Sequence, residues 1–414
     1  GAEVAPMFSR RHLLWAGGAW PLAAQPPKPA PENSAAPSTL RIDPALMPEI
    51  PAEPPRPAAE APPPLRGAQW KIRYFLDELD QSLNFTAFVS PAPEFALASG
   101  IVRGARRGRP QNLGVASRDG GANWSEIKLP APAASLFALD PAHVWLVSGN
   151  RLYFSDDGAA KWSRLRLPRR MARVHFLTPL DGFAFGFGKT FYRTADGGRT
   201  WSEVPESAKL PLTDENTVFR SMAFVGGRVG LLAGNSRRPV EDDRYLPDWM
   251  MPERALGRRP RPATTVFLST LDGGATWKPS IPSAFGDVIR VRLRGRHAAA
   301  LFDYGEGFPW PSEVMHNDLT TGKNEPYFRR RGLPVHDLLL LEGDACLLAL
   351  IEPFGKLPGA GLPGRLRLVW SPDGKQWFQM PADYRAQGPS VLLAGQGESL
   401  FAAMSNGMIL RMEK

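Results

Sequence analysis

The segment Thr194-Ala195-Asp196-Gly197-Gly198-Arg199-Thr200-Trp201 contains a pattern that occurs five times in the chain. The pattern is Ser or Thr, any residue, Asp, any residue, Gly, two further residues and Trp. The five copies span residues 117–124, 155–162, 194–201, 270–277 and 371–377. Ala159 replaces the glycine in the second copy, and the last copy is one residue shorter. The first three copies begin at almost equal spacing, which indicates a repeated structural unit.

The residue types in this pattern, here called the box, are those of a tight turn between two strands. An Asp side chain accepts hydrogen bonds from the amides of its own turn. Glycine supplies a positive φ without steric cost, and Trp, at the start of the next strand, fills the gap between neighbouring sheets. We therefore predict a structural role for the box residues Asp119, Trp124, Asp157, Trp162, Asp196, Trp201, Asp272, Trp277, Asp373 and Trp377.

The box resembles the Asp-box, or bacterial neuraminidase repeat, of β-propellers. The resemblance extends over residues 67–414 and implies an all-β fold of four-stranded antiparallel blades. We predict a seven-bladed β-propeller, with six blades as the alternative. The last 25 residues contain only three strands, so we expect an N-terminal strand within residues 70–75 to complete the last blade. Such closure leaves no exposed sheet edge in the ring.

The first 66 residues differ from the rest in composition. Arg10 and Arg11 precede a short apolar stretch that ends in small residues at 22–24, which resembles a twin-arginine export signal. Fourteen of the 43 prolines lie within residues 26–64, and such a segment cannot bury enough apolar surface to fold. We predict a signal over residues 1–24, a Pro/Ala-rich linker over 25–66, and a periplasmic or otherwise exported propeller over 67–414.

Composition limits the other classes of function. A single cysteine, Cys346, excludes a disulfide within the chain and Cys-rich zinc sites. Six scattered histidines give no metal-binding motif, so we expect no metal and no cofactor. No apolar run of membrane-spanning length follows the signal, and we expect a monomer without an integral membrane span. The net charge of +9 is compatible with nucleic acid, but we expect none to be bound by an exported protein without a known nucleic-acid module.

The strand order of a blade separates its connections into two faces. Turns between strands A and B and between C and D lie on one face, here the box face. Connections from B to C and from D to the next A lie on the other, here the loop face. The long loops at 101–112, 235–263, 303–312 and 352–364 are expected on the loop face, where function usually lies.

Arginine is concentrated in the loop-face connections, together with a few aromatic residues. This combination is typical of an interface centre. The candidate partner-binding residues are Arg103, Arg106, Arg107, Arg109, Arg169, Arg170, Arg237, Arg238, Tyr245, Trp249, Arg258, Arg259, Arg261, Arg329, Arg330 and Arg331. The alternative is a merely solvated basic surface in an arginine-rich protein. Arg290, Arg292 and Arg294 alternate in one inner strand, either lining the axial channel or lying solvated at its edge.

The repeats and the export signal resemble photosystem II stability and assembly factors. That resemblance implies a non-enzymatic scaffold that binds a protein subunit of a membrane complex through an Arg-rich face. The alternative is a sialidase-like glycoside hydrolase, which needs three arginines, a Tyr–Glu pair and an Asp. Tyr304, Glu306, Asp242 and Asp243 are expected on the loop face, but the spacing assembles no complete set, and we assign no catalytic residue.

Overall fold

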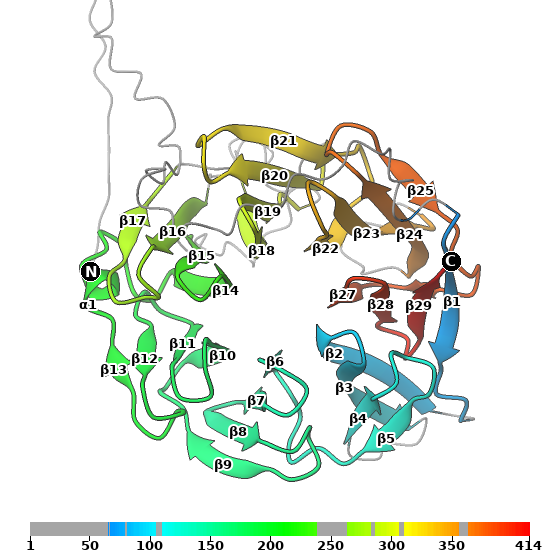
Figure 1. Cartoon of the computed structure of the whole chain (residues 1–414), viewed down its shortest axis with the longest axis horizontal. Coiled ribbons are helices and arrows are strands. Elements are labelled where there is room, and N and C mark those ends of the chain that lie inside the picture. The colour runs from blue at the N-terminus through cyan, green and yellow to red at the C-terminus, as the bar shows by residue number, and fades with distance from the viewer. Residues whose placement is uncertain are drawn as a thin grey trace, which may run out of the picture. The chain divides into compact units, whose positions relative to one another are not determined.

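The computed structural model describes residues 65, 67–78, 81–104, 110–237, 263–282, 286–305, 310–355 and 363–414. The chain divides into two compact units, 1–36 and 37–414, and every described residue belongs to the second. The predicted signal at 1–24 and nearly all of the predicted linker lie outside the described residues. The second unit is a ring of seven antiparallel sheets around a central axis (Figure 1). The predicted seven-bladed, all-β propeller is therefore confirmed, and the six-blade alternative is wrong.

Six blades are formed by consecutive strands, with strand A next to the axis. Their strands, in the order A to D, are β2 (Gln81–Ala92), β3 (Phe95–Gly104), β4 (Gln111–Ser117) and β5 (Ser125–Ile127) in blade 1; β6 (Ser135–Ala138), β7 (Val144–Ser148), β8 (Arg151–Ser155) and β9 (Ser163–Arg166) in blade 2; β10 (Met171–Phe176), β11 (Gly182–Gly186), β12 (Tyr192–Thr194) and β13 (Ser202–Glu203) in blade 3; β14 (Thr217–Val225), β15 (Val229–Ser236), β16 (Thr264–Thr270) and β17 (Lys278–Ser280) in blade 4; β18 (Asp287–Arg294), β19 (His297–Asp303), β20 (Ser312–Asp318) and β21 (Asn324–Arg329) in blade 5; and β22 (Val335–Leu340), β23 (Cys346–Pro353), β24 (Gly364–Ser371) and β25 (Phe378–Met380) in blade 6. A short helix, α1 (Pro205–Ala208), follows blade 3, and β26 (Gln387–Gly388) pairs with β24.

Blade 7 joins the two ends of the propeller. Its strands are β27 (Val391–Gln396), β28 (Ser399–Met404) and β29 (Ile409–Glu413), and β1 (Gln69–Tyr74) pairs antiparallel with β29 as the outermost strand. Trp70 of β1 lies opposite Met412 and is almost fully buried. The predicted N-terminal closure is therefore confirmed, and hydrogen bonds between distant parts of the sequence close the ring.

The five boxes form the turns between strands C and D. In the first, the Ser117 hydroxyl donates to the Asp119 carboxylate at 2.8 Å and accepts from the Gly121 amide at 2.8 Å. The carboxylate also accepts from the Asn123 amide at 2.9 Å. The shorter fifth copy keeps only part of this network, with Asp373 accepting from the Lys375 amide at 2.8 Å. The turn thus satisfies backbone amides within its own residues. The buried indole N–H groups of Trp124, Trp162 and Trp277 have no hydrogen-bond partner among the described residues.

The box tryptophans pack against the preceding blade. Trp124 meets Phe401 of blade 7 edge-on, with ring centroids 5.7 Å apart. Trp277 meets Phe183 of blade 3 in the same way at 5.5 Å, and the Trp377 indole N–H donates to the Tyr327 carbonyl of blade 5 at 3.1 Å. The apolar core consequently lies between the blades, and the box tryptophans packed there hold neighbouring blades together around the axis.

Candidate functional site

The described candidate arginines all lie at the loop-face ends of their strands. Arg103 is the last residue but one of β3, Arg237 follows β15, and Arg329 ends β21. The others lie between the last strand of one blade and the first of the next: Arg169, Arg170, Arg330 and Arg331. The strand directions thus place these seven side chains on one face. The candidates Arg106, Arg107, Arg109, Arg238, Tyr245, Trp249, Arg258, Arg259 and Arg261 lie outside the described residues.

Three of these seven arginines are paired with carboxylates of the protein itself. Arg170 pairs with Asp214, Arg237 with Asp287 at 3.0 Å, and Arg329 with Glu313 at 3.7 Å. The other four are exposed and form no ion pair within the described part of the chain: Arg103, Arg169, Arg330 and Arg331.

The loop face also carries exposed aromatic side chains that the sequence analysis missed. Phe75 is 47% exposed, Phe187 59%, Trp310 43% and Phe354 56%. Each lies just beyond the loop-face end of a strand, and the Arg329 guanidinium lies 5.0 Å above the Trp310 ring. Large apolar side chains exposed beside arginine are typical of protein interfaces. Their position directly beside the strand ends gave no distinguishing signal, because an aromatic residue next to a buried strand looks like core in a sequence.

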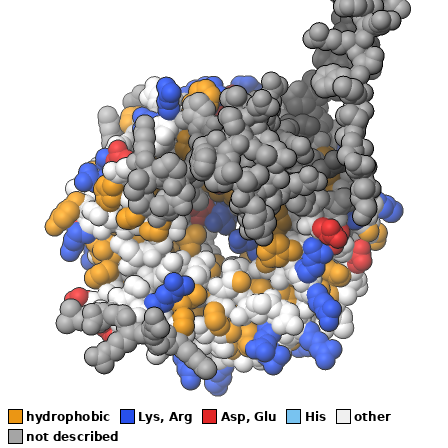
Figure 2. Space-filling model, turned by 180° about the vertical axis from the view of Figure 1, so that it is seen from behind, with side chains coloured by type: hydrophobic (Ala, Val, Ile, Leu, Met, Phe, Trp, Pro, Cys, Tyr) orange, Lys and Arg blue, Asp and Glu red, His pale blue; other side chains and the backbone are white. Residues whose placement is uncertain are grey.

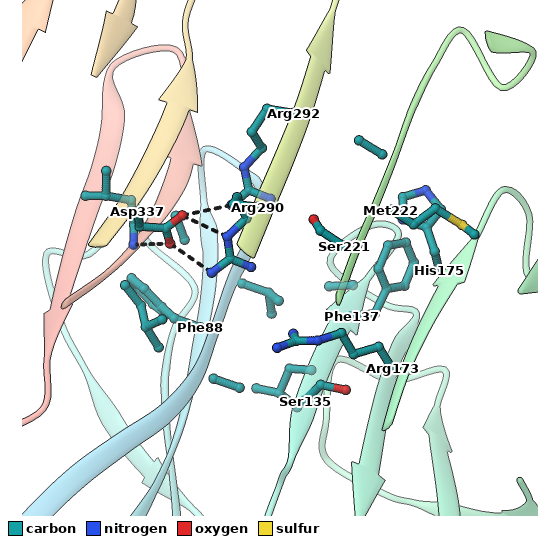
Figure 3. Close-up of a pocket in the computed structure, with 18 of the residues that line it drawn as sticks. Phe88, Ser135, Phe137, Arg173, His175, Ser221, Met222, Arg290, Arg292 and Asp337 are labelled. Carbon is teal, nitrogen blue, oxygen red and sulfur yellow. Dashed lines mark hydrogen bonds and ion pairs between the residues drawn. The ribbon is translucent and has the colours of Figure 1, made fainter. Parts of the chain in front are cut away.

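The axial channel is the cavity best defined by the described residues. Its volume is about 380 Å³, and strand A of every blade contributes to its wall. Figure 2 shows the channel mouth as an opening at the centre of the molecule with charged side chains near it. Apolar side chains, among them Phe88, Phe137 and Met222, share the wall with four arginines and one aspartate (Figure 3).

One level of the channel wall, here the channel layer, is defined by strand register. In each of the five boxed blades, the box Ser or Thr pairs with a residue of strand B. The residue three positions further along strand B pairs with a residue of strand A, and this strand-A residue belongs to the channel layer. These residues are Ala87, Ser135, Arg173, Ser221 and Asp337. In four of these blades a register irregularity immediately precedes the residue, and in blade 5 one precedes Arg290. Bulges of this kind re-aim side chains, here into the channel.

Three side chains of the channel layer bond to the next blade. Ser135 donates to the Ala172 carbonyl at 2.9 Å, Ser221 accepts from the Val291 amide at 3.0 Å, and Asp337 accepts from the Leu393 amide at 3.0 Å. These bonds are structural, because they join adjacent inner strands. Arg173, in contrast, forms no hydrogen bond or ion pair within the described residues.

Asp337 gathers two arginines of the neighbouring inner strand. The Arg290 Nε donates to it at 2.9 Å, and the Arg292 guanidinium lies 3.7 Å away. Arg290 and Arg292 therefore line the channel, whereas Arg294 lies outside the described lining and pairs with Glu342 at 3.9 Å. Of the three alternating arginines, two therefore line the channel and the third does not, because the strand reaches the rim of the channel at Arg294.

Desolvation and the positive charges of neighbouring arginines lower the pKa values of basic side chains in the channel. Desolvation, followed by the charges of Arg290 and Arg220, lowers the pKa of Arg173 to about 10. Desolvation and the Arg290 charge likewise lower the pKa of Arg292 to about 10. Desolvation and Arg292 lower the pKa of His175 to about 3. At neutral pH the arginines are therefore charged and His175 is neutral.

The sialidase alternative requires a Tyr–Glu pair beside three arginines. The Tyr304 hydroxyl donates to Glu313 at 2.6 Å, but neither residue is among the described residues that line the channel with its arginines. Burial and Glu313 raise the pKa of Tyr304, which disfavours a phenolate nucleophile. Glu306, Asp242 and Asp243 lie outside the described residues. Of the three arginines that such a site needs, the described ion pairs place Arg329 beside Glu313.

Two further properties concern only the described residues. Within them, no helix is both long enough and apolar enough to cross a membrane. No group of three or more His, Cys, Asp or Glu side chains there is placed to hold a metal ion.

No protein-family model and no curated protein sequence matches the chain. Among solved structures, YCF48 bound to a D1 peptide has a TM-score of 0.53 at 15% identity, covering 86% of this chain and 99% of that one. YCF48 from Cyanidioschyzon merolae has a TM-score of 0.51 at 16% identity, covering 83% and 98%. Acylaminoacyl peptidase from Pyrococcus horikoshii has a TM-score of 0.50 at 9% identity, covering 80% and 51%. The expected resemblance to the photosystem II assembly factors is confirmed for the fold, and a peptidase propeller shares that fold.

Proposed function

We propose that this chain is an exported, non-enzymatic propeller scaffold that binds a protein partner through its loop face. The observation that carries the proposal is the combination on one face of four exposed, unpaired arginines with four exposed aromatic side chains. Desolvated aromatic and arginine side chains supply most of the binding energy at protein interfaces. A YCF48 propeller of similar fold was solved with a D1 peptide bound, which supports peptide or protein binding here.

We further propose that the partner belongs to a membrane-associated complex and that the scaffold serves its assembly or stability. The charge-reversal variant Arg169→Glu/Arg330→Glu/Arg331→Glu tests this role by affinity capture from detergent-solubilised membranes. We expect a membrane complex with wild type and its loss with the variant, because like charges replace the attraction. The matched control is Lys161→Glu/Arg228→Glu/Lys375→Glu, which makes the same charge change at exposed box-face turns. Equal capture by both variants would contradict the proposal.

The aromatic residues provide a second test that leaves the charge unchanged. Phe187→Ala/Phe354→Ala removes two exposed rings, so the thermal midpoint should change little while capture falls. Retained capture would show that these aromatic residues are not part of the interface.

Hydrolysis of a fluorogenic sialoside by wild type, abolished in Tyr304→Phe, would instead establish the glycosidase alternative.

The proposed export is tested separately from binding. A fusion carrying residues 1–66 should direct a folded reporter out of the cytoplasm, and Arg10→Lys/Arg11→Lys should prevent it. Cytoplasmic retention of the unaltered fusion would contradict export without affecting the loop-face proposal.

A further inference from the structure

The axial channel carries more positive charge than its own residues neutralise. Among the arginines of the described lining, Arg220 is paired with Asp287 at 3.7 Å. Arg173, Arg290 and Arg292 face one aspartate, Asp337, a formal excess of +2 with His175 neutral. The guanidinium groups repel one another, and after desolvation this repulsion contributes to the lowered pKa values of Arg173 and Arg292.

Asp337 cannot neutralise the rest, because its two oxygens are already occupied. Oδ1 accepts from the Arg290 Nε and from the Leu338 amide, both at 2.9 Å. Oδ2 accepts from the Leu393 amide at 3.0 Å and from the Arg290 Nη2 at 3.3 Å. A buried carboxylate bound in this way holds Arg290 in place and joins three blades, but it offers nothing to Arg173.

Arg173 extends into the cavity opposite Arg290 (Figure 3). Its guanidinium has five N–H donors, and none of them has an acceptor within the described residues. Arg290 uses Nε and Nη2 on Asp337, and Arg292 uses Nε on the Leu338 carbonyl at 3.2 Å. Each of these two retains an Nη1 group with no hydrogen bond to a described residue. Three guanidinium groups therefore present spare donors to the same cavity.

Apolar side chains share the wall of the channel with these donors and with polar side chains such as Ser135 and Ser221. Phe88, Phe137 and Met222 are drawn beside them in Figure 3. A volume of about 380 Å³ lies at the lower end of the range of small-ligand sites. Water accepts hydrogen bonds from such donors but does not neutralise the charge of three converging cations, whereas planar guanidinium forks match the charged oxygens of phosphate or carboxylate.

We propose that the channel binds a small, doubly charged oxyanion, a phosphate or a dicarboxylate, held by Arg173 together with Arg290 and Arg292. The anion lies where the spare N–H donors of these three arginines meet, and the apolar side chains of the wall contact the carbon atoms of a dicarboxylate. This site is independent of the loop-face interface, and its occupation requires no protein partner.

The test is a titration of the full chain with inorganic phosphate and, separately, with succinate. Ionic strength is held constant with chloride, and binding is followed by calorimetry and by the thermal midpoint. We expect saturable binding of one anion per chain and a rise in the thermal midpoint, because a ligand of the native state stabilises it. The anion with the lower Kd identifies phosphate or carboxylate as the ligand chemistry.

The variant Arg173→Gln separates binding from folding, because Arg173 supports no described contact. We expect at least a tenfold loss of affinity from losing a charged bidentate donor. In chloride alone, the variant should have a thermal midpoint equal to or above that of wild type, because one repelling charge is gone. Arg169→Gln, on the connection leading into the same strand but outside the described lining, is the matched control and should bind like wild type.

Two results would overturn the proposal. One is the absence of saturable binding of either anion up to about 10 mM, the range in which even a weak site of about 1 mM would be filled. The other is equal affinity in wild type and Arg173→Gln, which would place the anion elsewhere.

Discussion

The box turns and the channel layer are two places where every boxed blade repeats one backbone geometry, yet only the first repeats its residues. Each box must solve the same hydrogen-bonding problem, so Asp recurs in all five. The channel layer places Ala87, Ser135, Arg173, Ser221 and Asp337 at one level, and of these Ser135, Ser221 and Asp337 bond to the next blade. A residue repeated at equivalent positions of the blades is therefore one that the fold requires. A residue that differs between equivalent positions is one whose side-chain type the repeated fold does not constrain.

The largest expected effect is that of removing the carboxylate at the centre of the channel layer. Asp337→Ala leaves Arg290 and Arg292 without a buried counter-charge, which typically costs about 3–5 kcal/mol. Urea unfolding of the variant should show this loss against wild type. Asp181→Ala, which breaks the exposed pair with Arg193, should cost at most about 1 kcal/mol. Equal losses would mean that the channel pair is as well solvated as a surface pair.

The next effect concerns a box glycine that packs against the neighbouring blade. A Cβ on Gly274 would approach Phe183 Cζ to 2.3 Å at a φ of +83°. Gly274→Ala should therefore cost about 1–3 kcal/mol from overpacking, in addition to backbone strain. Gly226 has a φ of +59° with nothing within 4 Å of its Cβ, so Gly226→Ala measures the strain alone. The same denaturation midpoint in both variants would contradict inter-blade packing at the box.

The box carboxylates should give the protein a distinct acid response. The Asn123 amide and side chain hold the pKa of Asp119 at about 2, below its ordinary value of 3.8. Because the native state binds protons less readily than the unfolded chain, stability present above about pH 4 is lost as the pH falls toward 2. We expect the thermal midpoint to fall less steeply over this window in Asp119→Asn than in wild type. Parallel profiles would show that the box network does not lower the pKa.

The smallest expected effect is a gain in stability at the imperfect box. Ala159 has a φ of 72°, a conformation that costs an L-residue about 1–2 kcal/mol. Ala159→Gly should raise the free energy of unfolding by about 0.5–1 kcal/mol, because glycine flexibility and the lost methyl offset part of the relief. Ala160→Gly, at the exposed next position, should lower it slightly. A loss of stability in Ala159→Gly would mean that methyl packing outweighs the strain.

The outer strands show where the sequence analysis was imprecise about the fold. It placed Trp at the start of the outermost strand, whereas β5 begins at Ser125 and β13 at Ser202, each one residue after the box Trp. An edge strand facing solvent has few packing neighbours, so its apolar pattern does not define where pairing begins or ends.

The candidate site was predicted less completely than the fold. Loop lengths and arginine positions placed Arg103, Arg169 and Arg330 on one face, since strand direction follows from strand order. The exposed Phe187 and Phe354 were not identified, because an aromatic residue beside a buried strand looks like core in a sequence. Whether Arg290 lined the channel or was solvated was left open, because a single register irregularity before it decides where it points.

The sequence by itself determined the blade architecture and its closure, because the box is a local turn whose chemistry lies within eight consecutive residues. Only the tertiary structure decided the content of the channel. Its wall joins strands from all seven blades, separated by hundreds of residues, and bulges that no local pattern announces set the level of each side chain. The convergence of Arg173, Arg290 and Arg292 around one saturated carboxylate is therefore a property of ring closure, since each blade alone contributes only one face of the channel.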